Sequence, residues 1–370
     1  MKNTIAANLI RYRKGLHISQ DRLAERVGMS RQTIINYEKA QTLPDSKSLS
    51  LLAKHLGVRL DDLLRPVDRL PQTTSNFCFR AHSTFTKKPQ FATYIQNLLT
   101  TYTALETAVG LPPYAPETTP CHQVQGDEHR IQQIAKSFRT RLGFGDAPIQ
   151  NLFEAVEEIG LKVLRLPIAQ DDFFGVSACS ATQGAFVLIN THNISIERQL
   201  FTLAHEIGHL IFHRDEYQDQ LLASTDKDIE KAREAVANYF ASHLLVSQVA
   251  FEQARHNMQD DLLRLKAYFR VSYATILKRF DELGINDYGA MIKNLRWRYK
   301  QQTGYSLEKG IELEPCLQDR DFLLNQRYQT LIWQALKLEK ISESKAAELL
   351  NITIEALRLE RQQREVFSVV

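Results

Sequence analysis

The spacing of apolar and polar residues divides the chain into helical stretches around one short region of alternation. Over most of the 370 residues, apolar positions recur every three to four residues, which predicts amphipathic helices. Short runs rich in β-branched residues predict strands over 162–166, 175–180 and 185–190, forming a small antiparallel sheet. The expected fold class is α+β and mostly helical: an all-α N-terminal domain, a central α+β domain and a helical C-terminal region.

The first part of the chain contains five predicted helices. Ile5, Leu9 and Tyr12 have the spacing of the inner face of a first helix. Ser19 is a suitable N-cap for the second helix, and Gly28 ends that helix and makes the turn. The other helices are predicted over 30–38, 48–56 and 60–64. Two short helices joined through a glycine turn form a helix-turn-helix arrangement, so residues 1–66 are predicted to be one such domain.

The positive charge of the chain is concentrated in this first domain. Residues 1–68 contain 12 Lys and Arg against 7 Asp and Glu, a balance of +5, whereas the whole chain carries +3. A basic module on a nearly neutral chain indicates a polyanionic partner. The alternative interpretation is that the polar residues only face solvent or contact another protein.

The same domain resembles the XRE family, the lambdoid-repressor type of helix-turn-helix. The resemblance rests on Ser19-Gln20, Leu23-Ala24, Gly28, Ser30, Ile34, Glu38, Pro44, Leu52-Ala53 and Leu56-Gly57-Val58. It implies that the helix starting near residue 30 enters the major groove of double-stranded DNA, where Arg suits guanine and Gln or Asn suits adenine. The implied DNA-binding residues are Ser30, Arg31, Gln32, Thr33 and Asn36, together with Gln20 on phosphate. Such modules usually read two half-sites as dimers, so a homodimer is expected.

A His-Glu-x-x-His sequence lies within an apolar, helical run over 202–213. Positions i and i+4 share one face of a helix, so His205 and His209 can offer two imidazole nitrogens to one metal. Glu206 lies beside the pair, where its carboxylate can take a proton from water that a divalent metal has acidified. Because the motif is short, the alternative is a buried helix with two incidental histidines.

A second predicted helix, over 229–245, supplies a third metal ligand. Catalytic zinc usually takes three protein ligands and leaves a fourth position for water. We predict Glu234 as the carboxylate ligand, and Asn238, one turn later, as the residue that orients a ligand histidine. Glu230 is the rival ligand, but it lies closer to the charged helix start, where a carboxylate is favoured as a solvated N-terminal charge.

The segments 198–209 and 234–245 resemble the ImmA/IrrE family of metallopeptidases, as do 145–149 and 174–177. The chain departs from the family pattern at Val236, where an acid often stands. The resemblance implies a zincin-like domain whose site is gluzincin-like: two histidines, a glutamate ligand and a glutamate base hold Zn²⁺, with Mn²⁺ or another divalent ion as alternatives. It also implies that a sheet edge near the metal helix accepts substrate as an added strand. The expected edge strand consists of Phe186, Val187, Leu188, Ile189 and Asn190.

Stabilising the transition state of peptide hydrolysis requires a hydrogen-bond donor opposite the metal. His213 lies one turn beyond His209 on the same helical face and is a candidate catalytic residue. Tyr217 and Tyr239 are further candidates. A histidine that ends an apolar helix can instead cap the helix or support a metal ligand, and this alternative stays open for His213.

The remaining segments connect or follow these two domains. Residues 67–125 are predicted to be a connector, with a helix over 91–109 and a proline-rich stretch over 111–120. The metallopeptidase-like domain is predicted over 126–250. A helical region for dimerisation or sensing is predicted over 251–370.

Together these features predict a DNA-binding transcriptional regulator with a zinc-dependent endopeptidase, and the family resemblance implies that the peptidase cleaves a regulatory protein, often a transcriptional repressor. The rival hypothesis is a transcription factor whose peptidase-like domain is catalytically silent and only senses a ligand, metal or partner. The intact Glu206 argues against the rival. A general degradative protease is disfavoured, because a DNA-binding module would have no purpose there.

Composition favours a cytoplasmic location. No run of about 18 apolar residues exists, and the N-terminus lacks the apolar core of a signal peptide, so no membrane contact is expected. The four cysteines form no Cys-x-x-Cys pair. Neither a thiolate zinc site nor a disulfide framework is therefore indicated, which fits a reducing cytoplasm.

Overall fold

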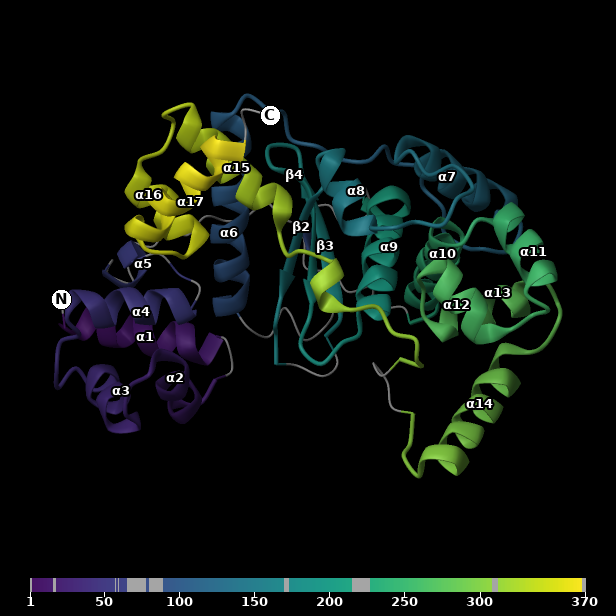
Figure 1. The fold of residues 1–370 in the computed structure, drawn as a ribbon, viewed down its shortest axis with the longest axis horizontal. Coiled ribbons are helices and arrows are strands. Elements are labelled where there is room, and N and C mark those ends of the chain that lie inside the picture. Colours follow the sequence, from purple (N-terminus) through teal and green to yellow (C-terminus); the bar gives the residue numbers. More distant parts are fainter. Residues whose placement is uncertain are drawn as a thin grey trace. The chain divides into compact units, whose positions relative to one another are not determined.

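The computed structural model describes residues 2–15, 18–56, 58, 60–64, 78–79, 89–169, 173–214, 227–307 and 312–367 (Figure 1). The chain forms two compact units. The first unit consists of Met1–Asn76, Ser83–Pro112 and Tyr328–Val370, and the second consists of Phe77–His82 and Pro113–Arg327. This division differs from the predicted boundaries at 125 and 250, because most of the proline-rich stretch belongs to the second unit and the last helices belong to the first.

The first unit begins with the expected five helices. They are α1 (Lys2–Gly15), α2 (Gln20–Val27), α3 (Arg31–Glu38), α4 (Ser46–Leu56) and α5 (Leu60–Leu64). Leu9, Leu23, Ile34, Leu52 and Leu63 are fully buried in their common core. Each of these helices therefore contributes an apolar face, which is the arrangement that the helical spacing predicts.

Four longer or later helices complete the first unit, although the first two residues of one of them, α15, belong to the second unit. They are α6 (Pro89–Ala108), α15 (Gln326–Lys337), α16 (Glu343–Leu350) and α17 (Ile354–Phe367). Helix α6 contacts α1 and buries Ile95, Leu99, Tyr102 and Leu105, which belong to the apolar stripe of the predicted helix over 91–109. Helices α16 and α17 contact each other.

The second unit is built on a mixed sheet with the strand order β1-β3-β4-β2. The strands are β1 (Cys78–Phe79), β2 (Lys162–Leu166), β3 (Gly175–Ser180) and β4 (Gly184–Asn190). Strands β3 and β4 form an antiparallel hairpin, but β2 pairs with β4 in parallel. The prediction of an antiparallel sheet is therefore wrong for β2, because alternation identifies a strand without indicating which neighbour it pairs with.

The prediction that Phe186–Asn190 form a sheet edge is also wrong. These residues lie in β4, which is hydrogen-bonded to β3 on one side and to β2 on the other. All seven residues of β4 are buried. An interior strand has no free backbone groups for an added strand, so β4 cannot accept substrate in this way.

Helices cover the sheet of the second unit (Figure 1). Helix α9 (Ile196–Phe212) packs against β3 and β4, and α10 (Lys227–Leu245) packs against α9. Gly208 allows this close approach, because a Cβ atom there would lie only 3.1 Å from Cα of Ala237. Helices α7 (Glu128–Arg141) and α8 (Leu152–Glu158) contact α10 and α9, respectively.

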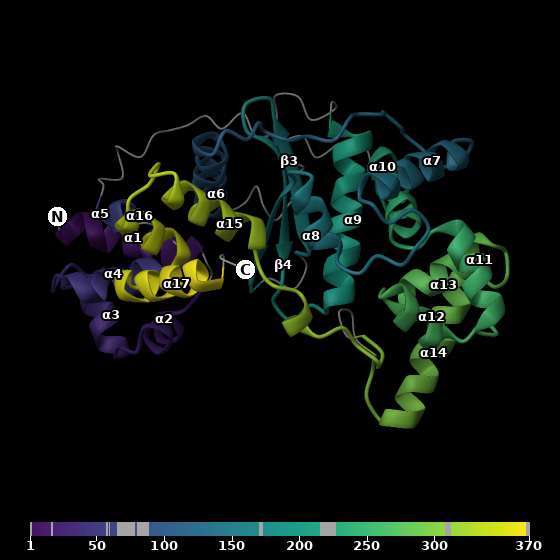
Figure 2. The same ribbon diagram turned by 45° about the horizontal axis from the view of Figure 1, so that its top comes forward.

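A group of short helices follows α10 (Figure 2). It contains α11 (Gln248–Asn257), α12 (Leu262–Phe269), α13 (Tyr273–Glu282) and α14 (Tyr288–Thr303). Buried Lys266 of α12 binds Glu197 of α9, with Nζ 3.1 Å from Oε1. This ion pair joins the group of helices to α9, which carries the His-Glu-x-x-His sequence. None of the described helices is both long and apolar enough to cross a lipid bilayer.

The proline-rich stretch is bound along the second unit by its backbone. The N–H of Ala185 donates to the carbonyl of Tyr114 at 2.7 Å, and the N–H of Thr119 donates to the carbonyl of Ile211 at 2.8 Å. The second contact brings residues that follow Thr119 close to the end of α9.

Candidate metal centre and DNA-reading helix

Helices α9 and α10 bring His205, His209 and Glu234 together. The two Nε2 atoms of the histidines are 3.0 Å apart, and they lie 3.3 Å (His205) and 3.7 Å (His209) from the Glu234 carboxylate. One ligand atom from each residue lies within 4.8 Å of the others. The rival Glu230 instead lies beside Arg233, with 3.7 Å between its Oε2 and Nη1 of the arginine. The three residues that come together are therefore the ones predicted from the sequence, with Glu234 in place of Glu230.

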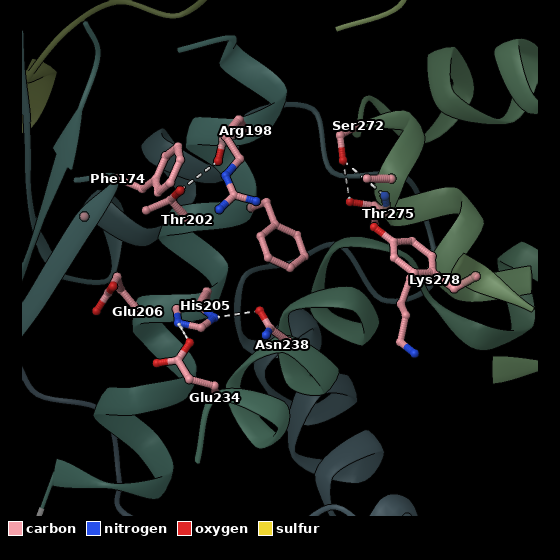
Figure 3. Close-up of a pocket in the computed structure, with 14 residues that line it drawn as sticks. Phe174, Arg198, Thr202, His205, Glu206, Glu234, Asn238, Ser272, Thr275 and Lys278 are labelled. Atoms are coloured by element: carbon pink, nitrogen blue, oxygen red, sulfur yellow. Dashed lines mark hydrogen bonds and ion pairs between the residues drawn. The ribbon is translucent and has the colours of Figure 1, made fainter. Parts of the chain in front are cut away.

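Hydrogen bonds behind the histidines fix which nitrogen faces the centre. Nδ1 of His205 lies 2.9 Å from Oδ1 of Asn238, an oxygen that can only accept (Figure 3). Nε2 of His213 lies 3.0 Å from the carbonyl oxygen of Cys121, and Nδ1 of His213 lies 2.9 Å from Nδ1 of His209. Because a carbonyl accepts, neutral His213 carries its proton on Nε2, and His209 must donate from Nδ1. Both ligand histidines then present a bare Nε2.

The donor set fits a divalent metal. Two Nε2 lone pairs and a carboxylate converge on one point, an arrangement that repels itself unless a cation lies between them. Two imidazoles and one carboxylate are among the ligand sets of catalytic zinc, and they leave a fourth position open. Supporting hydrogen bonds to Nδ1 are usual for such ligands.

Glu206 lies next to the three candidate ligand residues without joining them. Only 5% of its surface is exposed, and Oγ of Ser177 on β3 donates to its Oε2 at 2.6 Å. The strand therefore holds one carboxylate oxygen in place. The other oxygen remains available for a reacting group in the pocket.

A pocket of about 490 Å³ opens beside these residues (Figure 3). One wall comes from α9 and α10, together with Gly175 at the start of β3 and Phe174 just before it. The opposite wall comes from the first turns of α13 with Ser272, Ala274, Thr275 and Lys278, together with Tyr288. The pocket is an open cleft in which a peptide could meet His205, Glu206 and Glu234.

The predicted transition-state donors lie elsewhere. His213 is completely buried, does not line the pocket and has both ring nitrogens occupied by His209 and Cys121. This position supports the alternative interpretation, in which His213 supports the candidate ligand His209 and does not itself take part in catalysis. The hydroxyl of Tyr239 accepts from Gln132 at 2.6 Å, and this residue does not line the pocket either. Tyr217 lies outside the described residues.

Several residues of the site were not predicted from the sequence. Ser177 and Arg198 occur in the segments that carry the family resemblance, but nothing in their spacing indicates a contact with Glu206 or the pocket. The Cys121 contact uses a backbone carbonyl, which no side-chain pattern can reveal. Val236, the departure from the family pattern, is fully buried in the hydrophobic core. It lies two positions after Glu234 on α10, which places it on the opposite side of the helix.

In the first unit, α3 presents most of the predicted DNA-binding residues. Ser30 is the N-cap, and its Oγ accepts from the N–H of Thr33 at 3.0 Å. Ser30, Arg31 and Gln32 are exposed, whereas Thr33 and Asn36 are half-buried. The amide of Gln32 donates to Oδ1 of Asn36 at 2.9 Å, and the Arg31 guanidinium lies 3.2 Å from Asp21. These are exposed, weak contacts that a DNA duplex could replace.

Gln20 and Glu38 belong to a buried polar network beneath α3. The Arg13 guanidinium forms a two-pronged ion pair with Glu38, whose side chain is 4% exposed. The Gln20 amide nitrogen donates to Oε2 of Glu38 at 2.7 Å, so this nitrogen serves the interior of the module. The network fixes α3 against α1 and α2.

Each of the two units contains a segment that is similar to a known protein family. Residues 9–63 match the helix-turn-helix family model. An uncharacterized HTH-type transcriptional regulator of Methanocaldococcus jannaschii is 40% identical over 57 residues, which are 15% of this chain and 86% of the relative. The chain belongs to this family of helix-turn-helix regulators. In the same chain, residues 156–281 match the peptidase M78 family model, which describes the IrrE N-terminal-like domain.

Both family resemblances inferred from the sequence are thereby confirmed. A helix-turn-helix domain implies a DNA partner, and a domain of a metallopeptidase family implies a protein substrate. The peptidase match extends to residue 281 and so includes most of α13, the helix that forms the far wall of the pocket.

Proposed function

We propose that the regulator binds operator DNA through α3 and that its second unit is a zinc-dependent endopeptidase. Its substrate is a regulatory protein, and the family resemblance supports a transcriptional repressor. The observation that carries the proposal is the convergence of His205, His209 and Glu234 within 4.8 Å beside the buried carboxylate of Glu206. A purely structural helix pair has no need of that arrangement.

In this proposal the residues of the chain divide the work of hydrolysis. When bound, the metal supplies a Lewis acid that acidifies water and polarises the peptide carbonyl. Glu206 accepts the proton of the attacking water and passes it to the leaving amine. Ser177 holds one Glu206 oxygen at 2.6 Å, which directs the other oxygen toward the substrate. Asn238 and His213 keep the two ligand histidines in the required tautomer.

The metal site is tested by measuring the zinc content of the purified full chain by mass spectrometry. We expect near-stoichiometric zinc in the wild type and little in His209→Ala and Glu234→Ala. Glu230→Ala is the matched control, because it removes a carboxylate one turn earlier on α10, and it should keep the metal. A wild type that stays metal-free after zinc is supplied would contradict the proposal.

The peptidase activity is tested by comparing the wild type with a variant that lacks the proposed general base. Zinc-loaded wild type and Glu206→Gln are each incubated with a cell extract, and new protein N-termini are identified by mass spectrometry. We expect termini that only the wild type generates, and equal DNA binding by both proteins. A zinc-loaded wild type that generates no such termini would favour the silent sensor.

A further inference from the structure

Arg198 lies at the end of the pocket remote from the metal ligands. It precedes His205 by seven residues on α9, which is two turns, so both residues share the helix face that lines the pocket (Figure 3). Seven residues of α-helix rise roughly 10 Å. An extended peptide covers about 3.3 Å per residue, so this separation corresponds to two or three substrate residues.

The Arg198 guanidinium is held in place but lacks an anionic partner among the described residues. Its Cζ lies 4.4 Å from the ring centre of Phe174 and 5.6 Å from that of Phe201. Its Nε is buried and has no hydrogen-bond partner. Burial lowers the pKa of Arg198, but a guanidinium remains protonated at neutral pH. A partly buried cation without a counterion is costly, and an incoming anion would remove that cost.

The opposite wall of the pocket also favours an anion. Helix α13 points its N-terminus at the pocket from the opposite wall, and Lys278 follows one and a half turns later. Lys278 contributes less, because its Nζ already lies 2.6 Å from Asp281 and its side chain is 47% exposed. The acidic residues that line the pocket, Glu206 and Glu234, lie at the metal end.

We infer that Arg198 is a specificity-determining residue that binds a carboxylate of the peptide substrate, two or three residues from the bond that is cleaved. This inference rests on the proposed endopeptidase function. The planar guanidinium matches a carboxylate with two parallel hydrogen bonds, and the flanking aromatic rings fix its plane. The carboxylate comes either from an Asp or Glu side chain or from the C-terminus of the substrate.

The test measures peptide retention and needs no turnover. Zinc-loaded full-length Glu206→Gln is immobilised and exposed to random heptapeptides, half with free C-termini and half with C-terminal amides. We expect Asp and Glu to be enriched at least tenfold at one position among retained peptides, or retention to require the free C-terminus. The first result assigns a side-chain carboxylate and the second a terminal carboxylate. Absence of both preferences would overturn the inference.

Variants show whether Arg198 causes the preference. The double variant Glu206→Gln/Arg198→Met should lose at least nine-tenths of the enrichment, whereas Glu206→Gln/Lys278→Met should keep most of it. Unchanged enrichment in the Arg198 variant would overturn the inference. Equal zinc content shows that α9 remains intact. If Arg198→Met loses zinc, the comparison uses Arg198→Lys, which keeps the charge without the planar fork and should lower the enrichment at least threefold.

The same variants separate this inference from the proposed function. If zinc-loaded wild type cleaves proteins without any preference for a nearby carboxylate, the endopeptidase stands and the role of Arg198 is refuted. If no Glu206-dependent cleavage occurs, the endopeptidase is refuted, and the retention experiment still decides whether Arg198 binds a carboxylate.

Discussion

Helices α2 and α3 of the first unit share their local geometry with helices α12 and α13 of the second. In both pairs, a capping residue starts the first helix, a left-handed residue ends it nine positions later, and a serine starts the second helix two positions after that. These residues are Ser19, Gly28 and Ser30 in one pair and Asp261, Arg270 and Ser272 in the other. The two helix pairs are therefore joined by turns of the same backbone conformation.

The hydrogen bonds around the two turns correspond closely. Ser30 Oγ accepts from the N–H of Thr33 at 3.0 Å, and Ser272 Oγ accepts from the N–H of Thr275 at 3.1 Å. Ile34 and Ile276, four residues after each serine, are both fully buried. Both pairs therefore share a buried isoleucine at this position.

The two pairs differ in what the second helix faces. Gln32, Thr33 and Asn36 form the predicted DNA-reading face of α3. The corresponding positions of α13 are Ala274, Thr275 and Lys278, and all three line the peptidase pocket. The same helix face is therefore directed at DNA in one proposal and at a peptide in the other. A helix-turn-helix backbone presents a helix, and the side chains and surroundings of that helix determine its partner.

The largest expected effect concerns how α3 is held. Glu38→Ala leaves the buried Arg13 without its partner, and we expect a loss of about 3–5 kcal/mol in the stability of α3, together with loss of DNA binding. Position 280, which corresponds to 38, holds the buried Phe280, so the ion pair of Glu38 has no counterpart at this position of α13. Hydrogen exchange on peptides from α2 and α3 measures the effect. The exposed control Glu25→Ala should change stability by less than about 0.5 kcal/mol, and equal exchange in both variants would contradict the prediction.

The next effect concerns the partners of the two helices. Using an operator selected from random duplexes by the wild-type chain, we expect Arg31→Ala and Gln32→Ala each to weaken binding by about 1–3 kcal/mol, roughly 5- to 150-fold. Thr275→Ala and Lys278→Ala are the matched controls on α13 and should leave DNA affinity unchanged. Electrophoretic or anisotropy titration at fixed salt measures all four. A similar loss from Lys278→Ala would mean that both pairs contact DNA.

A smaller effect concerns the start of α13. Burial raises the pKa of Glu312 to about 7, and its Oε1 accepts from the N–H of Tyr273 at 3.1 Å. Because this pKa lies above the ordinary value of 4.5, the stabilising contribution is complete below about pH 4.5 and is lost as pH rises through about 7. Protection of α13 amides should therefore fall by on the order of 1–2 kcal/mol between pH 5 and pH 8. Glu312→Gln should flatten that dependence, and a steep slope in the variant would contradict it.

The smallest effect concerns the two left-handed turn residues. Gly28 has φ 65°, and Gly28→Ala should cost about 1 kcal/mol, because a side chain rarely adopts that conformation. Arg270 has φ 57°, so Arg270→Gly should have the opposite sign. That gain is reduced by loss of the guanidinium contact over the Phe322 ring at 5.3 Å. Local hydrogen exchange compares the two, and equal signs would show that the turns carry different strain.

Local patterns were sufficient to predict most elements of the fold. The capping serines, Gly28 and the apolar spacing predict α2 and α3 because each signal acts within a few residues. The strands β2 and β3 have the predicted bounds for the same reason. The position of β4 inside the sheet was not predictable, since strand order depends on contacts between distant segments.

The same distinction between local patterns and contacts of distant segments applies to the candidate site. His205 and His209 are adjacent through helix geometry alone, and Glu234 follows from a periodic second helix. Ser177 and the α13 wall reach the pocket only through tertiary packing. The buried contacts of His213 likewise depend on where the proline-rich stretch runs, which no local pattern indicates.

The contact between His213 and residue 121 has a consequence for how this protein can vary. His213 binds the backbone carbonyl of Cys121, which every amino acid possesses. Substitutions at 121 that preserve the chain path can therefore leave the metal ligands undisturbed. A residue inserted or deleted between Thr119, which is pinned to Ile211, and residue 121 would shift the carbonyl out of register. At this point the candidate metal site constrains the length of the chain more strongly than the identity of its residues.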